Sequence, residues 1–103
     1  MVLKLYKNDK LELSLKGIKE EEKCLFDNII YDTNKNLLIR EDNDFKYTLD
    51  FNKKGVMIEL KEYNQLLKMI LKNVEIKKSK KGLRVKYIIE TEESILNEIE
   101  INF

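Results

Sequence analysis

The stretch that decides the fold is FKYTLDFNKKGVMIEL, residues 45–60. Its first part places apolar side chains at every second position, with polar residues between them: Phe45, Tyr47, Leu49 and Phe51. Such alternation is typical of a β-strand with one buried and one solvated face. Residues 52–55 predict a hairpin loop, in which Gly55 takes a positive φ. Residues 56–60 alternate again, so the stretch predicts a β-hairpin with an apolar face.

The same alternation extends towards both ends of the chain. Further strands are expected near residues 3–5, 11–15, 24–31, 37–40, 74–76, 83–89 and 99–103. Short strands at this spacing, about eight in all, are typical of sandwiches and barrels. Consecutive strands with short loops favour an antiparallel meander that closes into a barrel or half-barrel, since closure removes exposed edges. The pattern leaves barrel, half-barrel and sandwich open.

Residues 62–72 are ambiguous. Tyr63, Leu67, Ile70 and Leu71 fall at helical spacing, and the segment is rich in residues that favour helix. The same residues are compatible with a strand buried on both faces, which periodicity cannot distinguish from a helix. An α+β fold with a helix at about 62–72 is therefore the alternative to the all-β fold.

Length and composition indicate one globular domain over residues 1–103. The chain is 43% hydrophobic and 38% charged, which is enough apolar surface for one core. The formal net charge of +1 gives no strong attraction to nucleic acid or membranes as a whole.

The absence of histidine and the single cysteine, Cys24, narrow the chemistry. Without histidine there is no imidazole acid, base or metal ligand, and one cysteine cannot form an intramolecular disulfide. No apolar run is long enough to cross a bilayer, and Lys4 and Lys7 interrupt any signal-peptide core. We therefore expect a cytoplasmic, non-enzymatic protein without cofactor or metal.

The last third of the chain carries a family resemblance. The segment 73–76, the turn Lys80-Lys81-Gly82, the strand 83–87 and the closing segment 94–101 are similar to the small bacterial YwiB-like proteins. That resemblance covers residues 37–72 loosely. It implies a calycin-like, or lipocalin-like, antiparallel barrel, and it favours a strand for Leu66 to Leu71. It implies no activity, because the family has no settled biochemical role and a fold does not fix function.

The aromatic residues of the expected inward faces form a candidate pocket for a small apolar ligand: Phe45, Tyr47, Phe51, Tyr63 and Tyr87. Small barrels commonly fill their interior with such side chains, so a plain core is the alternative interpretation.

A second candidate surface is the basic hairpin of residues 77–86, whose cations are Lys77, Lys78, Lys80, Lys81, Arg84 and Lys86. Cations of this density can neutralise phosphates, which makes weak nucleic-acid binding the alternative function. No aromatic residue alternates with them on that face to stack bases, so a solvated hairpin tip is the simpler interpretation.

The polar turn at residues 41–44 has acidic side chains but lacks the glycine and distal glutamate of a calcium loop. Cys24 is interpreted as a buried small hydrophobe rather than a reactive thiol. The function we expect is a binding module for a protein partner or a small apolar ligand. Self-association through an unpaired strand edge is also possible, because such edges pair readily with other strands.

Overall fold

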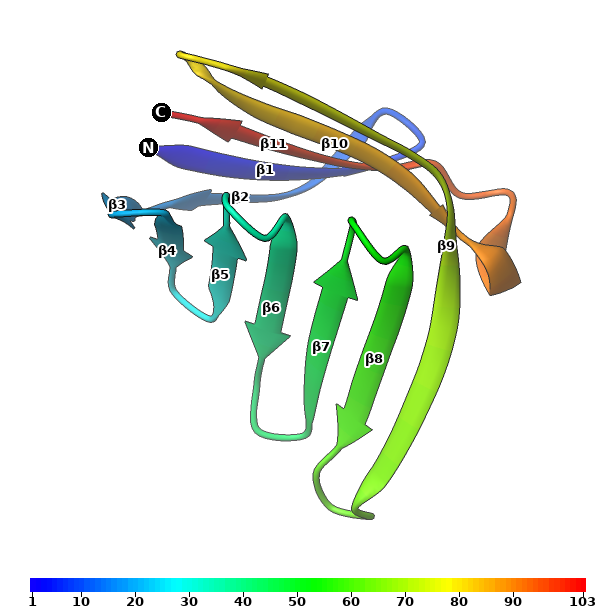
Figure 1. Cartoon of the computed structure of the whole chain (residues 1–103). Helices are drawn as coiled ribbons and strands as arrows, with labels where there is room; N and C mark the ends of the chain where they lie inside the picture. Colours follow the sequence, from blue (N-terminus) through cyan, green and yellow to red (C-terminus); the bar gives the residue numbers. More distant parts are fainter.

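The computed structural model describes residues 1–103 as eleven antiparallel strands and a single 3-10 turn, η1 (Glu90–Glu92) (Figure 1). The strands are β1 (Val2–Lys7), β2 (Lys10–Lys16), β3 (Ile18–Glu20), β4 (Lys23–Phe26), β5 (Ile29–Asp32), β6 (Leu37–Glu41), β7 (Phe45–Asp50), β8 (Gly55–Leu60), β9 (Gln65–Ser79), β10 (Gly82–Ile89) and β11 (Asn97–Asn102). The prediction of an all-β antiparallel fold is confirmed.

All strands belong to one nearly closed, barrel-shaped sheet with the order β2-β1-β11-β10-β9-β8-β7-β6-β5-β4-β3. The sheet bends back on itself as two layers that share β9 (Figure 1). Residues 65–70 of β9 pair with β8, and residues 71–79 run along β10. We call β1, β2, β10, β11 and residues 71–79 the first layer, and β3–β8 with residues 65–70 the second layer.

The corner between β2 and β3 is made by Gly17, which separates the two ends of the sheet order. A Cβ at this position would collide with the carbonyl oxygen of Leu25 and the ring of Phe26. Only glycine lets the chain turn this closely over β4, so the two terminal strands of the sheet meet at this corner.

Short polar turns explain why the strands form a meander. Asn8 and Asp9 both have positive φ, the backbone of a type I′ hairpin turn. At three later turns an aspartate side chain accepts hydrogen bonds from backbone N–H groups two and three residues ahead; these are Asp32, Asp42 and Asp50. Such bonds fix the reversal of the chain locally.

Two local predictions are wrong, and the alternative left open for residues 62–72 is decided in favour of a strand. The single strand expected over 24–31 is two strands, β4 and β5, because Asp27 adopts a positive φ of 40° and reverses the chain. The helix considered for 62–72 is instead a turn followed by β9, whose backbone is paired with β8. In the loop after β7 the left-handed residue is Lys54, with a φ of 57°, and not Gly55.

The core lies between the two layers. It contains fifteen buried hydrophobic residues: Leu3, Cys24, Phe26, Ile29, Tyr31, Leu38, Leu49, Phe51, Val56, Leu71, Leu83, Val85, Tyr87, Ile99 and Ile101. Its aromatic centre is Phe51, whose ring centroid lies 6.2 Å from that of Tyr31 and 5.2 Å from that of Tyr87. These contacts join β5 and the end of β7 to β10, so they hold the second layer against the first.

Candidate ligand-binding cleft

One line of side chains across the second layer shows where the interior is filled and where it is open. We call it the inner row; cross-strand pairing places its members side by side, in the order Phe26, Ile29, Arg40, Tyr47, Ile58 and Leu67. Phe26 and Ile29 are fully buried, whereas Leu67 at the other end is 48% exposed. Figure 1 shows the reason: β7, β8 and the start of β9 extend beyond the first layer.

A cleft of about 310 Å³ lies along the middle of the inner row, between the two layers. Eleven of its fifteen lining residues are hydrophobic: Leu5, Ile29, Leu38, Tyr47, Leu49, Val56, Ile58, Met69, Tyr87, Ile89 and Ile99. The other four are Lys7, Arg40, Glu92 and Asn97. An apolar concavity with a few polar groups is the usual form of a small-molecule site, and this volume is at the low end for such sites.

A second hollow, also of about 310 Å³, adjoins the cleft on the side of β1 and β2. The residues common to both hollows are Leu5, Lys7, Arg40, Tyr87 and Asn97. Four of these five can donate a hydrogen bond from the side chain. Donors are therefore concentrated at the junction of the two hollows, and apolar side chains dominate the rest of the cleft.

Arg40 is the only inner-row residue with a charge. It is half-buried and stands between Ile29 and Tyr47. The four ion pairs of the chain use Lys61, Lys72 and Arg84 as cations, so the Arg40 guanidinium has no carboxylate within 4.0 Å. Hydrogen bonds from the N–H groups of Phe45 and Asp44 are the main cause that lowers the pKa of Asp42, and the charges of Lys61 and Arg40 contribute less.

Two neutral polar side chains face the cleft from the first layer. Asn97 is the one buried polar residue, and its Nδ2 donates only long bonds of 3.5 Å to the carbonyl oxygens of Tyr87 and Ile95. Tyr87 is paired with Asn97 across β10 and β11. Burial, with a contribution from Glu92, raises the pKa of Tyr87 to about 12. The Tyr87 phenol is therefore protonated at neutral pH, and its hydroxyl can donate a hydrogen bond into the cleft.

The predicted aromatic pocket is brought together in part. Tyr47 and Tyr87 line the cleft, and Phe45 lies beside it, 4.7 Å from Tyr47 between ring centroids in an edge-to-face contact. Phe51 is buried in the core next to Tyr87 rather than exposed to the cleft. Tyr63 lies in the turn between β8 and β9 and is 71% exposed, so its placement on an inward face was wrong.

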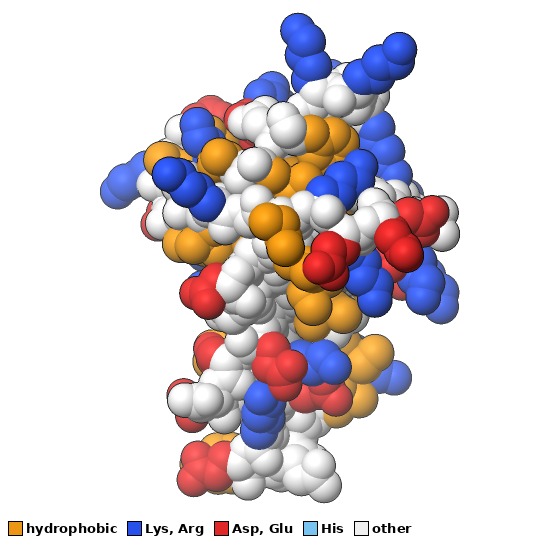
Figure 2. Space-filling model, turned by 90° about the vertical axis from the view of Figure 1, so that its left-hand side faces the viewer, with side chains coloured by type: hydrophobic (Ala, Val, Ile, Leu, Met, Phe, Trp, Pro, Cys, Tyr) orange, Lys and Arg blue, Asp and Glu red, His pale blue; other side chains and the backbone are white.

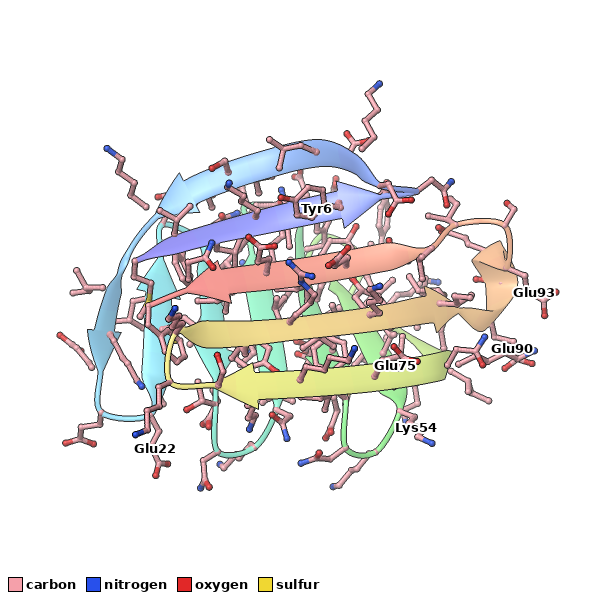
Figure 3. The ribbon with its side chains drawn as sticks, turned by 90° about the horizontal axis from the view of Figure 1, so that it is seen from above. Tyr6, Glu22, Lys54, Glu75, Glu90 and Glu93 are labelled. Carbon is pink, nitrogen blue, oxygen red and sulfur yellow. The ribbon has the colours of Figure 1, made fainter.

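The predicted basic surface is interrupted by carboxylates. Arg84 binds two glutamates, with Nε 2.9 Å from Glu98 Oε1 and Nη2 2.6 Å from Glu100 Oε2. In the cross-strand register, Lys86 lies opposite Glu75 of β9 and opposite Glu98 of β11. Figure 3 views this outer face of the first layer, with Glu75 on β9 and Tyr6 on β1. Charges of both signs therefore alternate there.

The remaining cations gather near the hairpin tip between β9 and β10. In the lateral view of Figure 2, basic side chains project at the top of the molecule, while acidic and basic groups mix below. Lys77, Lys78 and Lys81 line a shallow polar hollow together with Glu100 and Arg84. The Nζ of Lys78 donates to the carbonyl oxygen of Thr33 at 2.6 Å, so this lysine connects the two layers.

The minor candidates have structural partners. Cys24 is fully buried, as predicted, and burial raises the pKa of its thiol despite the nearby Lys19. Asp42 caps its turn, and Glu41 forms an ion pair of 2.8 Å with Lys61. Thiols of raised pKa are poor nucleophiles, and the carboxyl groups of this turn stabilise the hairpin.

Two polar residues of the cleft, Arg40 and Asn97, were not predicted from the sequence. A usable signal for Arg40 was present: Leu38 and Arg40 are two residues apart, so a strand through 37–40 places both on one face. For Asn97 the sequence carried no comparable signal, since strands commonly begin with a polar residue. Only the fold shows that this position is buried beside Tyr87 of β10.

Comparisons with known proteins returned no family model, curated protein or solved structure that matches this chain. The resemblance to YwiB-like proteins therefore stays a prediction. The structure contains no helix with the length and apolar character needed to cross a membrane.

Proposed function

We propose that the protein is a non-enzymatic binding module that takes a small apolar ligand in the cleft between its layers. The observation that supports this most directly is the unfilled stretch of the inner row. Tyr47 and Ile58 stay half-buried, and an apolar hollow of about 310 Å³ lies against them. Covering this surface with a ligand would remove apolar area from water, which is favourable by about 25 cal/mol per Å².

The cleft offers binding rather than catalysis. Its titratable lining residues are Lys7, Arg40, Tyr87 and Glu92, and the chain has neither a histidine nor an accessible thiol to activate. The pKa of Tyr87 is raised, which makes its phenolate a poor candidate for a base at neutral pH. No pair of groups in the lining has the nucleophile–base relationship that covalent catalysis requires.

The binding experiment uses the neutral fluorophore N-phenyl-1-naphthylamine, whose emission rises in an apolar site. We expect saturable fluorescence enhancement with the wild-type protein. Ile58→Trp adds bulk inside the cleft and should abolish the enhancement. The matched control is Glu59→Trp, at the neighbouring position on the opposite face of β8, which should bind as the wild type does. Absence of saturable enhancement in the wild type, or equal binding by both variants, contradicts the proposal.

A second candidate function, association with a second copy of the chain, is favoured by the outer face of the second layer. Cross-strand pairing aligns a largely apolar row there, which we call the outer row: Ile18, Leu25, Ile30, Ile39, Thr48 and Met57. Ile18 is 60% exposed and Met57 is 41% exposed. Contiguous exposed apolar residues of this kind mark interaction surfaces.

Charge placement on β7 indicates the second copy as the partner. Lys46 and Asp50 flank Thr48 by two residues on either side, on the same outer face. A two-fold axis along the outer row exchanges the two flanks, so it sets Lys46 of one copy against Asp50 of the other. Sedimentation equilibrium should show a dimer that Ile30→Glu converts to a monomer. A wild-type monomer at all concentrations would reject this function.

Nucleic-acid binding through residues 77–86 has weaker support, because Glu75, Glu98 and Glu100 stand among the cations. Fluorescence anisotropy with single-stranded RNA at low salt is the measurement. A salt-dependent rise that disappears in Lys80→Glu/Lys81→Glu would favour this alternative.

A further inference from the structure

The cleft contains an unpaired cation where a purely apolar site would have none. Arg40 stands on the inner row between two apolar neighbours, and no carboxylate of the chain lies within 4.0 Å of it. By contrast, the exposed Arg84 binds two glutamates. A half-buried guanidinium without a counter-charge is unfavourable, because it loses hydration without gaining a partner. An anion in the cleft would supply that partner.

The groups around Arg40 suit the same anion. Tyr87 and Asn97, paired on β10 and β11, line the junction of the two hollows together with Arg40 and Lys7. The Tyr87 hydroxyl has no hydrogen-bond partner in the chain. Every fully buried side-chain oxygen or nitrogen does have a partner, so the Tyr87 hydroxyl is not fully buried and is open to the cleft that Tyr87 lines. The cleft itself has two cations, Lys7 and Arg40, and one acidic residue, Glu92, whereas the adjoining hollow adds Glu12 and Glu98.

Beyond these donors the cleft is apolar, with Leu38, Leu49, Val56, Ile58, Met69 and Ile89 in its lining. A ligand that fills both regions has a charged oxygen group at one end and a hydrocarbon body at the other. A carboxylate fits the first region, since its two oxygens accept paired hydrogen bonds from one guanidinium. The volume of about 310 Å³ fits a medium-length hydrocarbon chain rather than a long one.

We propose that the cleft binds a small amphipathic carboxylate, with the carboxylate on Arg40 and the hydrocarbon part against β7–β9. This inference rests on the ligand-binding function proposed above and specifies its ligand class. The role assigned to Arg40 is recognition of the head group, and the apolar lining provides most of the contact area.

The experiment displaces bound N-phenyl-1-naphthylamine with decanoate or with decan-1-ol near neutral pH, both below their aggregation concentrations. The two competitors share a chain length and differ in the charged group. We expect decanoate to displace the probe at concentrations about tenfold to a hundredfold lower than decan-1-ol, the range that a charge-assisted hydrogen bond provides.

Three variants locate the effect. Arg40→Met keeps the length of the side chain and removes its charge, so decanoate should lose its advantage while decan-1-ol displaces as before. Arg40→Lys should keep part of the advantage. Lys53→Met removes an exposed cation from the turn between β7 and β8 and should behave as the wild type does.

The outcomes separate this inference from the proposal on which it rests. If the probe and decan-1-ol bind but decanoate is no better, or if Arg40→Met keeps the advantage of decanoate, the carboxylate assignment is wrong and the apolar site remains. If the probe itself does not bind, both proposals fail together.

Discussion

The two halves of the inner row have the same sequence pattern and opposite surroundings. At one end, Phe26 and Ile29 are fully buried beneath the first layer. At the other end, Ile58 is half-buried and Leu67 is largely exposed, although both point to the same side of the sheet. Alternation therefore decides which way a side chain points, and the cover from the other layer decides whether it becomes core or lines a site.

Arg40 stands at the boundary between these halves. A charged residue among the buried members of the row would lose all its hydration, whereas at the open end it would be an ordinary surface group. At the boundary a cation is both partly desolvated and reachable from solvent. Partial desolvation strengthens the attraction between the Arg40 guanidinium and a charged ligand, and access from solvent lets the ligand reach it.

The largest effect should come from the buried half. Phe26→Ala removes a fully buried ring next to the Gly17 corner. We expect the free energy of unfolding to fall by about 3–5 kcal/mol, from lost apolar burial and the cavity left behind. Urea denaturation followed by circular dichroism measures this change. If the free energy of unfolding fell by less than about 1 kcal/mol, the first layer would not cover Phe26 any more than it covers the open end of the inner row.

The next effect concerns the Gly17 corner, which joins the first layer to the second. Gly17→Ala puts a methyl group against the Leu25 carbonyl oxygen and the Phe26 ring. Overpacking of this kind costs about 1–3 kcal/mol. Gly55→Ala is the matched control, because a Cβ at Gly55 meets nothing within 4 Å. Similar midpoints for the two variants in urea would show that the corner is not tightly packed.

At Arg40, on the boundary between the two halves of the inner row, a substitution should stabilise the protein. Arg40→Met should raise the free energy of unfolding by about 0.5–2 kcal/mol, since it replaces an unpaired, half-buried charge by an apolar side chain. Thermal unfolding without ligand measures this gain. Combined with the expected loss of decanoate binding, it would identify Arg40 as a residue retained for function at the expense of stability. A destabilised variant would instead indicate a structural role for the guanidinium.

An ion pair outside the cleft provides a contrast with Arg40. Hydrogen bonds from Asn102 and Arg84 lower the pKa of Glu100 below its usual 4.5, so the folded state holds the charged form more strongly than the unfolded state does. This stabilisation is present above pH 4.5 and is lost as the pH falls through the lower pKa of the folded protein. Glu100→Gln should cost less than about 1 kcal/mol at neutral pH and flatten the acid side of the stability profile. An unchanged profile would show that the pair contributes nothing.

The smallest effect belongs to the open end. Leu67→Ala should change the free energy of unfolding by no more than about 0.5 kcal/mol, because the side chain is 48% exposed and nothing from the first layer covers it. The difference between the losses for Leu67→Ala and Phe26→Ala measures how much burial beneath the first layer contributes to stability. A loss of several kcal/mol would mean that the open end is covered in solution.

Much of this fold is predictable from the sequence. The strands at 45–60 and 83–89, and the pairing of β7 with β8, follow from alternation and turn residues that are close together in the chain. The reversal at Asp27 was missed because it uses a left-handed non-glycine residue within an apolar run. The cleft was only partly predictable: Tyr47 and Tyr87 were recognised as inward-facing, but which inward residues are covered depends on how far one layer extends past the other.

The pairing of β1 with β11 has a consequence for the order of assembly. Leu3 lies opposite Ile101, so residues that are far apart in the sequence are direct neighbours in one ladder. Local hairpins such as β7–β8 can form early, but this ladder must wait until residues 97–102 have been synthesised. Until then β1 has only β2 beside it, and its second edge is open to wrong partners. We therefore expect closure of the molecule to be a late step in folding, which follows the synthesis of β11.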